Sequence, residues 1–507
     1  MAESRFVPGE EPNFAALEFE AAARRGPSSV DELNELWPER LLHGYQQMVC
    51  AATAGEDIFA FANLLRDLPE TEWVLTEVYC GTASGSSAGH LLHLALKARG
   101  VHMRLKHYSC NDTNQLCQRF VLQQTMRPLH VFGDICERVP QPVLDHLRAA
   151  QDMFRQRAEE AIAVAPHVTR RSIYSEYGDL FFEEACSFLD GVSIDPNVKC
   201  WCYVHEQYCS VKPCLSPNSR WVELGGNTCT PWTTSGVGMG HLSPVSVAAI
   251  VWAYSVKDLG PHHVINECSA QWPALRFWHR VLNENALAPR KIRSMLLNPL
   301  SLGAPANRAR RYTHIAAASE KVRFGATRDH VMLAVGCTTE LKADDYFVAP
   351  PDALARFRAE LMRDRGFLLP PGVTRIKWDV LLPRHYRARL RRWRNFLRIR
   401  NIDVDDPQAY VCDIQHNPEY VGRAALQTMP ALQRTSYLYN LKRKRVLIPM
   451  EHFIVNGLPV FSHHSPVPLS WVESLSGDEV RGLAGNMMHV AVVGSLLGYI
   501  VLDAVNC

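Results

Sequence analysis

Residues 72–100 decide the fold of this chain and read EWVLTEVYCGTASGSSAGHLLHLALKARG. The part up to Tyr79 is mostly apolar, which predicts a buried β-strand. The glycine- and serine-rich part predicts a turn, and the leucine-rich part after it predicts a helix. This order is typical of sheets whose carboxyl edge lets the backbone approach a nucleotide-like ligand. A turn that only reverses the chain would look the same.

The same pattern recurs further along the chain. Residues 104–110 predict a strand, 111–125 a helix and 128–135 another strand, and the alternation resumes between residues 220 and 267. Strands that alternate with helices predict an α/β fold with a parallel, doubly wound sheet. Residues 140–166 predict one amphipathic helix, and the stretch from there to about 218 reads as irregular and cysteine-rich.

Length and composition narrow the class of protein. At 507 residues the chain is expected to contain two to four domains of about 100–200 residues each. With 47% hydrophobic and 21% charged residues, it is not a largely disordered, collagen-like or disulfide-scaffold protein. Its net charge of +2 creates no overall positive field that would attract nucleic acid, so an anionic partner has to bind at local basic patches.

The ends of the sequence bear on location. The first residues, MAESRFVPGEEPNF, lack the layout of a secretory signal, so the 15 cysteines are expected in a reducing compartment, nuclear or cytoplasmic with the nucleus favoured. The apolar segment Val490–Leu502 is shorter than the ~20 residues of a membrane-spanning helix and predicts a buried helix. We expect no membrane partner and a monomer.

Polar residues follow three successive predicted strands. The first strand ends in Glu77 and Tyr79, Asn111 and Asp112 follow the second strand, and Asp134 follows the third. An adenosine pocket needs such groups, because ribose hydroxyls and the base amino group seek acceptors. Helix-capping Asn and Asp residues would give the same pattern.

A second set of residues has catalytic chemistry. Cys229 follows a short apolar strand inside a small-residue loop, where a thiol can meet a substrate, although a buried and inert cysteine is the commoner outcome. Glu267 ends a later strand and offers a carboxyl group to a ring nitrogen. Arg308 and Arg310 alternate, so in an extended segment both guanidinium groups face one side.

The order of these segments resembles that of the cytosine-5 DNA methyltransferases, from Glu77 onward. The turn from Tyr79 to Gly85 resembles the S-adenosylmethionine motif, and Gly225–Trp232 (GGNTCTPW) resembles the nucleophile loop. The other matching segments are Gly133-Asp134-Ile135, Glu267 with Cys268 and Ser269, Ala306–Arg310, RVLIPMEHFIVNGLP at 445–459, and Ala484-Gly485-Asn486.

The resemblance implies a fold, a cofactor and roles. The fold is a Rossmann-like class I methyltransferase sheet with a smaller target-recognition domain, and the cofactor is S-adenosyl-L-methionine. Cys229 attacks C6 of a flipped-out cytosine in DNA, Glu267 holds N3, and Arg308 or Arg310 holds O2. The residues implied in cofactor binding are Tyr79, which stacks on the adenine, Gly81, Gly85, Asn111 or its neighbour Asp112 at the ribose, Asp134 at the amino group, and Asn486.

Departures from the family pattern leave alternatives open. Thr228 replaces a proline, Cys268 an orienting asparagine, Ala306 a glutamine, and Ala83 a glycine. Beside a DNA (cytosine-5-)-methyltransferase, two readings therefore remain: an impaired relative that only binds nucleic acid, and an enzyme that methylates RNA.

The N-terminal segment (1–70) is expected to be a loose tail to about residue 35, followed by a helical extension. The other parts expected are a catalytic domain (71–318) with an insertion at about 138–218, a recognition region (319–440) and a C-terminal segment (441–507) that completes the catalytic domain. The recognition region is expected to be mostly irregular. Within it, aromatic residues interleave with an arginine-rich run that favours phosphate contacts through Arg384, Arg387, Arg391, Arg392 and Arg394.

The cysteine-rich stretch at 200–214 favours free thiols over zinc ligands, because Cys-x-Cys is not the usual Cys-x-x-Cys spacing of a zinc site. We therefore predict no metal. The residues that zinc would use there are Cys200, Cys202, His205, Cys209 and Cys214.

Overall fold

The computed structural model describes residues 25–504, apart from 54–58, 166, 234–235, 237, 285, 287, 368–375, 404–410 and 420–427. Most of the predicted N-terminal tail lies outside the described residues. Its last part is helical, which corrects the prediction of a loose tail to residue 35. The helix α2 spans Val30–Glu35, and the side chain of Ser29 caps it by accepting a hydrogen bond from the Glu32 amide.

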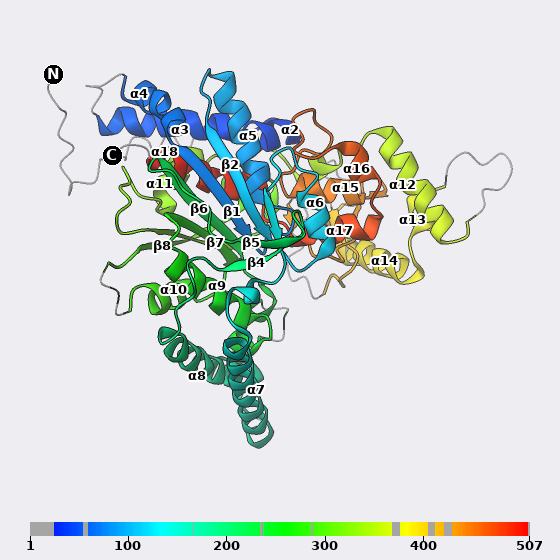
Figure 1. The fold of residues 1–507 in the computed structure, drawn as a ribbon. Coiled ribbons are helices and arrows are strands. Elements are labelled where there is room, and N and C mark those ends of the chain that lie inside the picture. Colours follow the sequence, from blue (N-terminus) through cyan, green and yellow to red (C-terminus); the bar gives the residue numbers. More distant parts are fainter. Residues whose placement is uncertain are drawn as a thin grey trace.

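A nine-stranded sheet lies at the centre of the molecule (Figure 1). Its strands, in spatial order, are β5 (Gln207–Ser210), β4 (Lys199–Cys202), β3 (His130–Phe132), β2 (Arg104–Asn111), β1 (Glu72–Val78), β6 (Ser219–Gly226), β7 (His263–Ser269), β10 (Arg310–Ala316) and β8 (Lys291–Leu297). The five strands from β3 to β7 are parallel, and the pairs at both edges are antiparallel. The order reverses at β1, so the predicted Rossmann-like, doubly wound sheet is confirmed. The antiparallel edges were not predicted.

Helices cover both faces of the sheet. In β7, Ile265 belongs to the apolar cluster on the side of α5 and α18, whereas Val264 belongs to the cluster on the side of α9 and α10. Strands buried on both faces read as continuous apolar runs, as the sequence did. The long helices are α3 (Trp37–Ala52), α4 (Ala60–Asp67), α5 (Ser84–Ala98), α7 (Gln141–Val164), α8 (Arg170–Asp190), α9 (Ser246–Leu259), α10 (Ala274–Leu282), α11 (Arg328–Val335), α12 (Pro351–Asp364), α14 (Arg384–Ile399), α17 (Gly477–Asn486) and α18 (Val490–Asp503).

Short elements complete the chain. The short helices are α6 (Gln115–Val121), α13 (Trp378–Leu381), α15 (Pro449–Val455) and α16 (Leu469–Glu473), with 3₁₀ turns at Leu68–Glu70, Ile135–Arg138, Thr230–Trp232, Gly240–Leu242, Pro299–Ser301 and Ala343–Tyr346. Two small sheets pair β11 (Val411–Asp413), β13 (Leu438–Asn440) and β14 (Arg445–Val446), and β9 (Ala306–Asn307) with β12 (Met429–Pro430).

The helix α18 is buried along its whole length, as predicted. It packs on α3 and α5, and a Cβ on Gly494 would lie only 2.4 Å from the ring of Trp37. Residues Gly477–Asp503 are long and apolar enough to cross a membrane, but 89% of their most apolar window is buried inside the protein. The core helix of a folded protein meets the same criteria of length and hydropathy.

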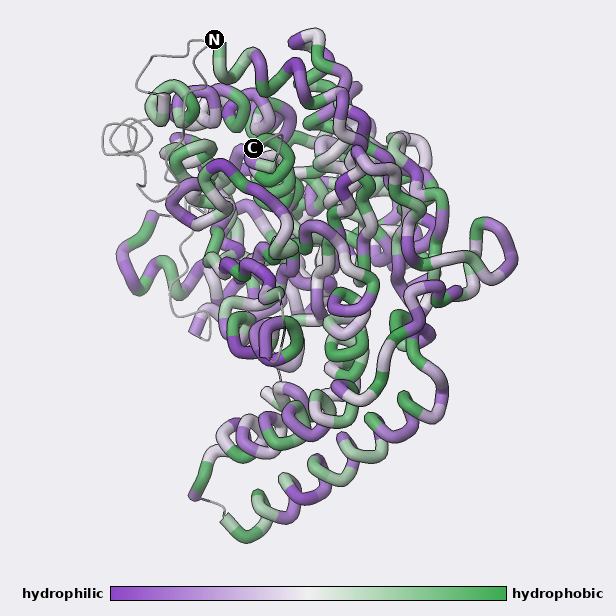
Figure 2. The backbone as a smooth tube through the Cα atoms, turned by 60° about the vertical axis from the view of Figure 1, so that its left-hand side comes forward, coloured by the Kyte–Doolittle hydropathy of each residue, from purple (hydrophilic) through white to green (hydrophobic). Residues whose placement is uncertain are grey.

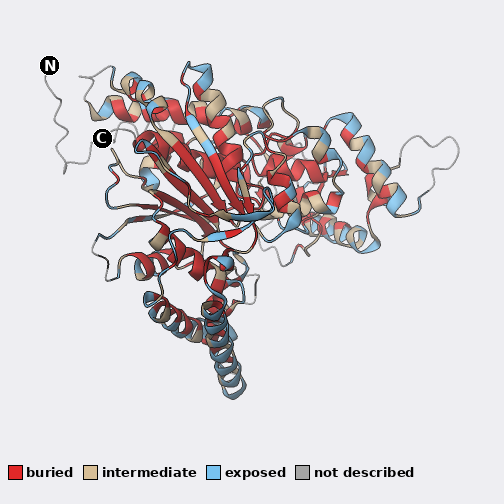
Figure 3. Ribbon diagram, viewed as in Figure 1, coloured by how far each residue is buried: buried red, intermediate tan, exposed pale blue. Residues whose placement is uncertain are grey.

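The insertion between β3 and β6 is more regular than predicted. The predicted helix is α7, but the stretch after it forms a second long helix, α8, instead of an irregular segment. Thr169 caps α8, and apolar residues such as Ile173, Phe181 and Leu189 recur along its buried side. The two helices pair into an arm that projects from the body, with an exposed outer end (Figures 2 and 3).

The region 319–440 is also more helical than predicted. The helix α11 packs on α3, beside the N-terminal helices, and α12 and α14 lie on the far side of the molecule (Figure 1). In α14, Leu390, Trp393 and Leu397 are buried at helical spacing, so this side anchors the helix while its arginines remain outside.

Candidate active site

A cleft of about 710 Å³ opens at the carboxyl ends of the parallel strands, a size typical of ligand sites. Both sets of predicted site residues meet there. The predicted residues that line it are Tyr79, Gly81, Asn111, Asp112, Asp134, Cys229, Glu267, Arg308, Arg310 and Asn486. The cleft therefore unites the cofactor-type residues with the catalytic-type residues.

Topology explains this convergence. The strands β1, β2, β3, β6 and β7 are parallel and deliver the residues that follow them to one edge of the sheet. The strand β10 is antiparallel to β7, so it begins at that same edge, and Arg310 is its first residue. Arg308 and Arg310 therefore enter the cleft from the start of a strand, whereas Cys229 and Glu267 enter from strand ends.

The glycine-rich turn has a left-handed backbone at three positions. Gly81 has φ +53°, and a Cβ there would lie 2.9 Å from the carbonyl oxygen of Asn486. Tyr79 and Ala83 also have positive φ values, 50° and 48°. Ala83 thus keeps a left-handed conformation that glycine adopts more readily, at a cost of about 1–2 kcal/mol. Backbone strain of this kind concentrates at functional sites.

Gly85 does not line the cleft. It packs inside the protein, where an added Cβ would lie 2.6 Å from Leu224 and 3.0 Å from the Glu77 carboxylate. That carboxylate accepts hydrogen bonds from the Gly85 and Ser86 amides, 3.0 and 2.8 Å long, at the start of α5. Burial raises the pKa of Glu77, while His107 and these amides oppose the shift. Gly85 is needed for close packing rather than for ligand contact.

Asp112 organises the turn. Its carboxylate accepts hydrogen bonds from the amides of Gly81 and Asn114, each 2.9 Å long. Burial raises the pKa of Asp112, and these amides oppose the shift. Asn111 is buried and accepts a hydrogen bond from Arg138 at 3.1 Å, while its own amide nitrogen has no partner among the described residues. Asn111 therefore has a free donor and Asp112 is an anchor of the loop.

The other cofactor-side residues have local partners. Asp134 caps the 3₁₀ turn Ile135–Arg138 by accepting a hydrogen bond from the Cys136 amide, which is the capping role that the sequence left open. Asn486 accepts a hydrogen bond from Arg434 at 2.8 Å. Tyr79 packs edge-on against Trp252, and within the described structure its hydroxyl has no partner. Burial raises the pKa of Tyr79 well above its usual value.

The loop after β6 presents Cys229, which is half-buried and lines the cleft. Asn227 holds the start of this loop, because its amide donates to the Glu267 carbonyl at 3.0 Å and its side chain accepts from Asn266 at 3.0 Å. Thr228, which directly precedes the thiol, is exposed. The loop is thus tied to β7 just before the thiol.

The carboxylate of Glu267 faces Arg310. The two groups form an ion pair, with Arg310 Nε 3.1 Å from Oε1, but the pair lacks the alignment of a hydrogen bond. Glu267 is only 7% exposed, and among the described residues Oε1 accepts no hydrogen bond. A buried carboxylate oxygen left in this state needs a donor, and the cleft is where a ligand donor would come from.

Arg308 links three segments. Its guanidinium donates to the carbonyls of Leu432 and Met487 at 3.2 and 2.9 Å, which ties the start of β10 to the segments before β13 and α18. Burial and the nearby Arg310 charge lower the pKa of Arg308. Its neighbour Ala306 is buried and pairs with Met429 between β9 and β12.

Comparison with solved structures finds methyltransferases. The Dnmt2 methyltransferase of S. pombe is 12% identical with a TM-score of 0.40, over 84% of this chain and 96% of that chain. The methyltransferase EhMeth of Entamoeba histolytica is 10% identical with a TM-score of 0.41, over 85% and 98% of the two chains. A putative DNA modification methyltransferase from an E. coli prophage is 12% identical with a TM-score of 0.40, over 85% and 98%. No family model matches the chain, and no curated protein matches it.

Several residues that line the cleft were not predicted as site residues, and three polar ones among them are Asn227, Arg148 from α7, and Arg434. Asn227 lies two residues before Cys229, and its polar side chain in a buried loop was a usable signal. Arg148 and Arg434 come from the insertion and from the region before β13, and nothing in their local sequence marks them.

The arginines of α14 form an exposed stripe. Arg384, Arg387 and Arg391 recur at helical spacing, and no ion pair or hydrogen bond holds them within the described structure. With Arg394 they line a second, shallower hollow beside Asp379. Arg394 pairs with Asp379 at 3.0 Å, and Arg392 donates to Asn417 at 3.2 Å. The predicted run therefore divides into free cations and paired ones.

Proposed function

We propose that this protein transfers a methyl group from S-adenosylmethionine to C5 of cytosine in DNA. The observation that supports this proposal most strongly is that Cys229, the carboxylate of Glu267 and Arg310 lie together in one cleft, with one carboxylate oxygen of Glu267 unsatisfied. These are a nucleophile, a group that holds and polarises a ring, and a cation for developing charge. The glycine turn and the strand-end polar groups line the rest of the same cleft.

The residues around β1–β3 fit the cofactor. Gly81 leaves backbone space beside Asn486, and Tyr79 and Asn111 each bring a polar atom without a partner among the described residues. These groups would hold the adenosine part, with Asp134 at the adenine and Asn486 closing the pocket. When bound there, S-adenosylmethionine supplies an electrophilic methyl group.

The residues around β6, β7 and β10 would activate the base. The Cys229 thiolate adds to C6 of a flipped-out cytosine, and the electron pair of the C5–C6 bond moves onto C5. A proton shared between the carboxyl group of Glu267 and N3 neutralises the charge that this attack creates, and the free oxygen accepts a hydrogen bond from the exocyclic amino group of the base. After C5 accepts the methyl group, loss of the C5 proton restores the double bond and expels Cys229.

The two arginines have different tasks in this proposal. Both terminal nitrogens of Arg308 already donate to backbone carbonyls, so Arg308 positions the strand that carries its neighbour. Arg310 borders the cleft beside Glu267 and is the cation that would contact the cytosine O2.

A methyl-transfer assay with labelled S-adenosylmethionine tests the function. We expect label in duplex DNA at C5 of cytosine, with RNA as the parallel substrate. Transfer to RNA alone would show that the substrate is RNA and not DNA. Absence of transfer to both polymers, with S-adenosylhomocysteine still bound, would support a binding protein in place of an enzyme.

DNA contact is assigned to the free stripe of α14. Replacing Arg384, Arg387 and Arg391 by Ala is expected to weaken DNA binding for all sequences, because phosphate contacts carry no sequence information. The slope of log K against log salt should shrink by up to about 3, since each lost phosphate contact is worth about 0.9. Fluorescence anisotropy at several salt concentrations measures both effects.

Arg400→Ala is the matched control, because Arg400 is exposed at the end of α14 but lies over the ring of Phe396 instead of in the stripe. Its slope should stay at the wild-type value. An unchanged slope in the triple variant would show that this stripe does not meet the phosphates.

A further inference from the structure

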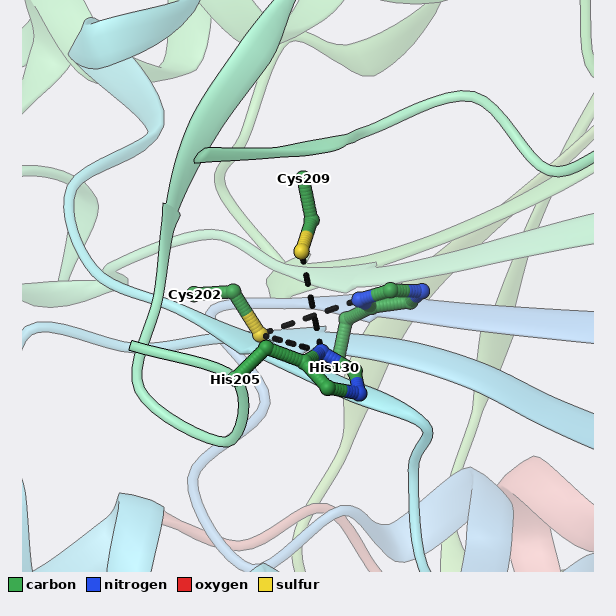
Figure 4. Close-up of side chains that lie close together, drawn as sticks. All are labelled: His130, Cys202, His205 and Cys209. Carbon is green, nitrogen blue, oxygen red and sulfur yellow. Dashed lines mark hydrogen bonds between the residues drawn. The ribbon is translucent and has the colours of Figure 1, made fainter. Parts of the chain in front are cut away.

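A cluster of sulfur and imidazole groups lies at the edge of the sheet, away from the residues assigned above (Figure 4). We call it the hairpin cluster, and its members are His130, Cys202, His205 and Cys209. Each offers one ligand atom, and the four atoms lie within 4.8 Å of one another. Only three of the five residues singled out in the sequence belong to it. Cys200 packs in an apolar cluster with Phe132 and Trp221, and Cys214 is exposed.

The fold brings the cluster together from two places. The strands β4 and β5 form a hairpin whose turn, residues 203–206, carries His205 between the two cysteines. This gives the spacing Cys-x₂-His-x₃-Cys. The fourth member, His130, begins β3, about seventy residues earlier, and β4 lies beside β3 in the sheet. No local sequence pattern could have included His130.

We propose that the hairpin cluster binds one Zn²⁺ ion in a closed tetrahedral site. The Cys202 sulfur lies 3.4 Å from Nδ1 of His205 and 3.7 Å from Nδ1 of His130, and the Cys209 sulfur lies 3.6 Å from Nδ1 of His205. Tetrahedral zinc with bonds of about 2.3 Å to sulfur and about 2.0–2.1 Å to nitrogen separates these ligand atoms by about 3.5–3.6 Å. The observed spacings match that geometry.

Hydrogen bonds alone cannot satisfy all four of these atoms. Both sulfurs approach one nitrogen, Nδ1 of His205, which has a single lone pair or a single proton to offer. A metal ion resolves this competition, because all four atoms then bond to the ion. Both thiols bind as thiolates, so each gives up a proton to solvent on binding.

Two thiolates and two imidazoles favour Zn²⁺ over Mg²⁺ or Ca²⁺, which prefer oxygen ligands. Four protein ligands leave no open position for water, so the proposed role is structural. Cys202 is buried and His205 is exposed, so solvent reaches the cluster from the outer side of the hairpin.

The hairpin needs such a clamp. The strands β4 and β3 share a single register pair, Phe132 with Cys202, and the Tyr203 amide donates to the Val131 carbonyl at 2.8 Å. Tyr203 also covers the end of β3, because a Cβ on Gly133 would lie 3.2 Å from its hydroxyl. The residue after Gly133 is Asp134, so the clamp would hold the segment that leads into the cleft.

Cobalt titration of the full chain tests this site. The reduced protein is freed of metal with a chelator and titrated with Co²⁺, which reports tetrahedral thiolate ligation through visible d–d and sulfur-to-metal charge-transfer absorption. We expect saturation at about one ion per chain, as for a closed structural site, and displacement of the bands by Zn²⁺. Chelation should also lower the melting temperature, and added Zn²⁺ should restore it.

Three variants remove ligands, namely C202S, H205Q and C209S. Each should weaken Co²⁺ binding by more than the about 10–100-fold that loss of an outer hydrogen-bond partner costs. His205 is exposed, so H205Q keeps the test valid even if the buried change C202S unfolds the protein. C214S is the matched control, since it removes an exposed thiol outside the cluster and should bind like the wild type.

The proposal is overturned by absence of the tetrahedral bands in the wild type, or by bands that persist unchanged in H205Q and C209S. A disulfide between Cys202 and Cys209 that persists in the metal-free protein in the presence of reductant would overturn it as well. Each of these results leaves the proposed methyl transfer untouched.

Discussion

DNA that contains 5-fluorocytosine is expected to become covalently joined to Cys229 in the presence of S-adenosylmethionine. Once Cys229 has added to C6 and C5 has accepted the methyl group, release of the enzyme requires loss of a proton from C5. Fluorine leaves no proton there, so the Cys229–C6 bond persists. A shifted band on a denaturing gel, dependent on the cofactor, measures this adduct, and RNA that contains 5-fluorocytosine is tested beside it.

Cys229→Ser should abolish the band, because a hydroxyl is a far poorer nucleophile near neutral pH than a thiol that ionises. Cys214→Ser is the control for adventitious thiol chemistry, since Cys214 is exposed but lies outside the cleft. A band that survives in Cys229→Ser, or no band on either fluorinated polymer, contradicts the assigned nucleophile.

Glu267→Gln is expected to slow methyl transfer by about 10²–10⁴-fold, the usual effect of losing a positioned acid–base group. The amide keeps the size of the side chain but removes the charge that faces Arg310 and the acidic proton that Glu267 would share with N3. Single-turnover methyl transfer with labelled cofactor measures the rate.

Affinity for S-adenosylhomocysteine separates a chemical effect from a structural one. Because Glu267 lies on the β7 side of the cleft, Glu267→Gln should bind this product as the wild type does. Glu184→Gln, on the exposed side of α8, should change neither quantity. Equal rates for Glu267→Gln and the wild type would remove Glu267 from the mechanism.

Much of the site could be predicted from the sequence, because parallel strands deliver the residues that follow them to one edge. Tyr79, Asn111, Asp134, Cys229 and Glu267 all lie at such ends, and local patterns mark them. The glycine turn is an exception, because its sequence pattern does not distinguish Gly81 from Gly85. Gly81 lies at the cleft and needs its positive φ, whereas Gly85 is required by the packing of Leu224 and Glu77.

Other parts were beyond local patterns. The division of the α14 arginines into free and paired ones depends on Asp379 and Asn417, which only the tertiary structure brings near. The contribution of His130 to the hairpin cluster depends on the antiparallel pairing of β4 with β3, which an alternation of strands and helices does not predict. The helix α8 is different, because its buried residues Ile173, Phe181 and Leu189 recur at helical spacing and a local pattern does predict it.

The burial of α18 against α3 and α5 imposes an order on biosynthesis. Trp37 and Ala88 leave the ribosome early, but the helix whose Gly494 receives them is made much later. At about 5–20 residues per second, translation of the intervening chain takes roughly 20–80 s. During that time the apolar side of the nascent α5 has no permanent cover. Nascent chains of this protein are therefore expected to depend on chaperones that shield this surface until residue 503 has emerged.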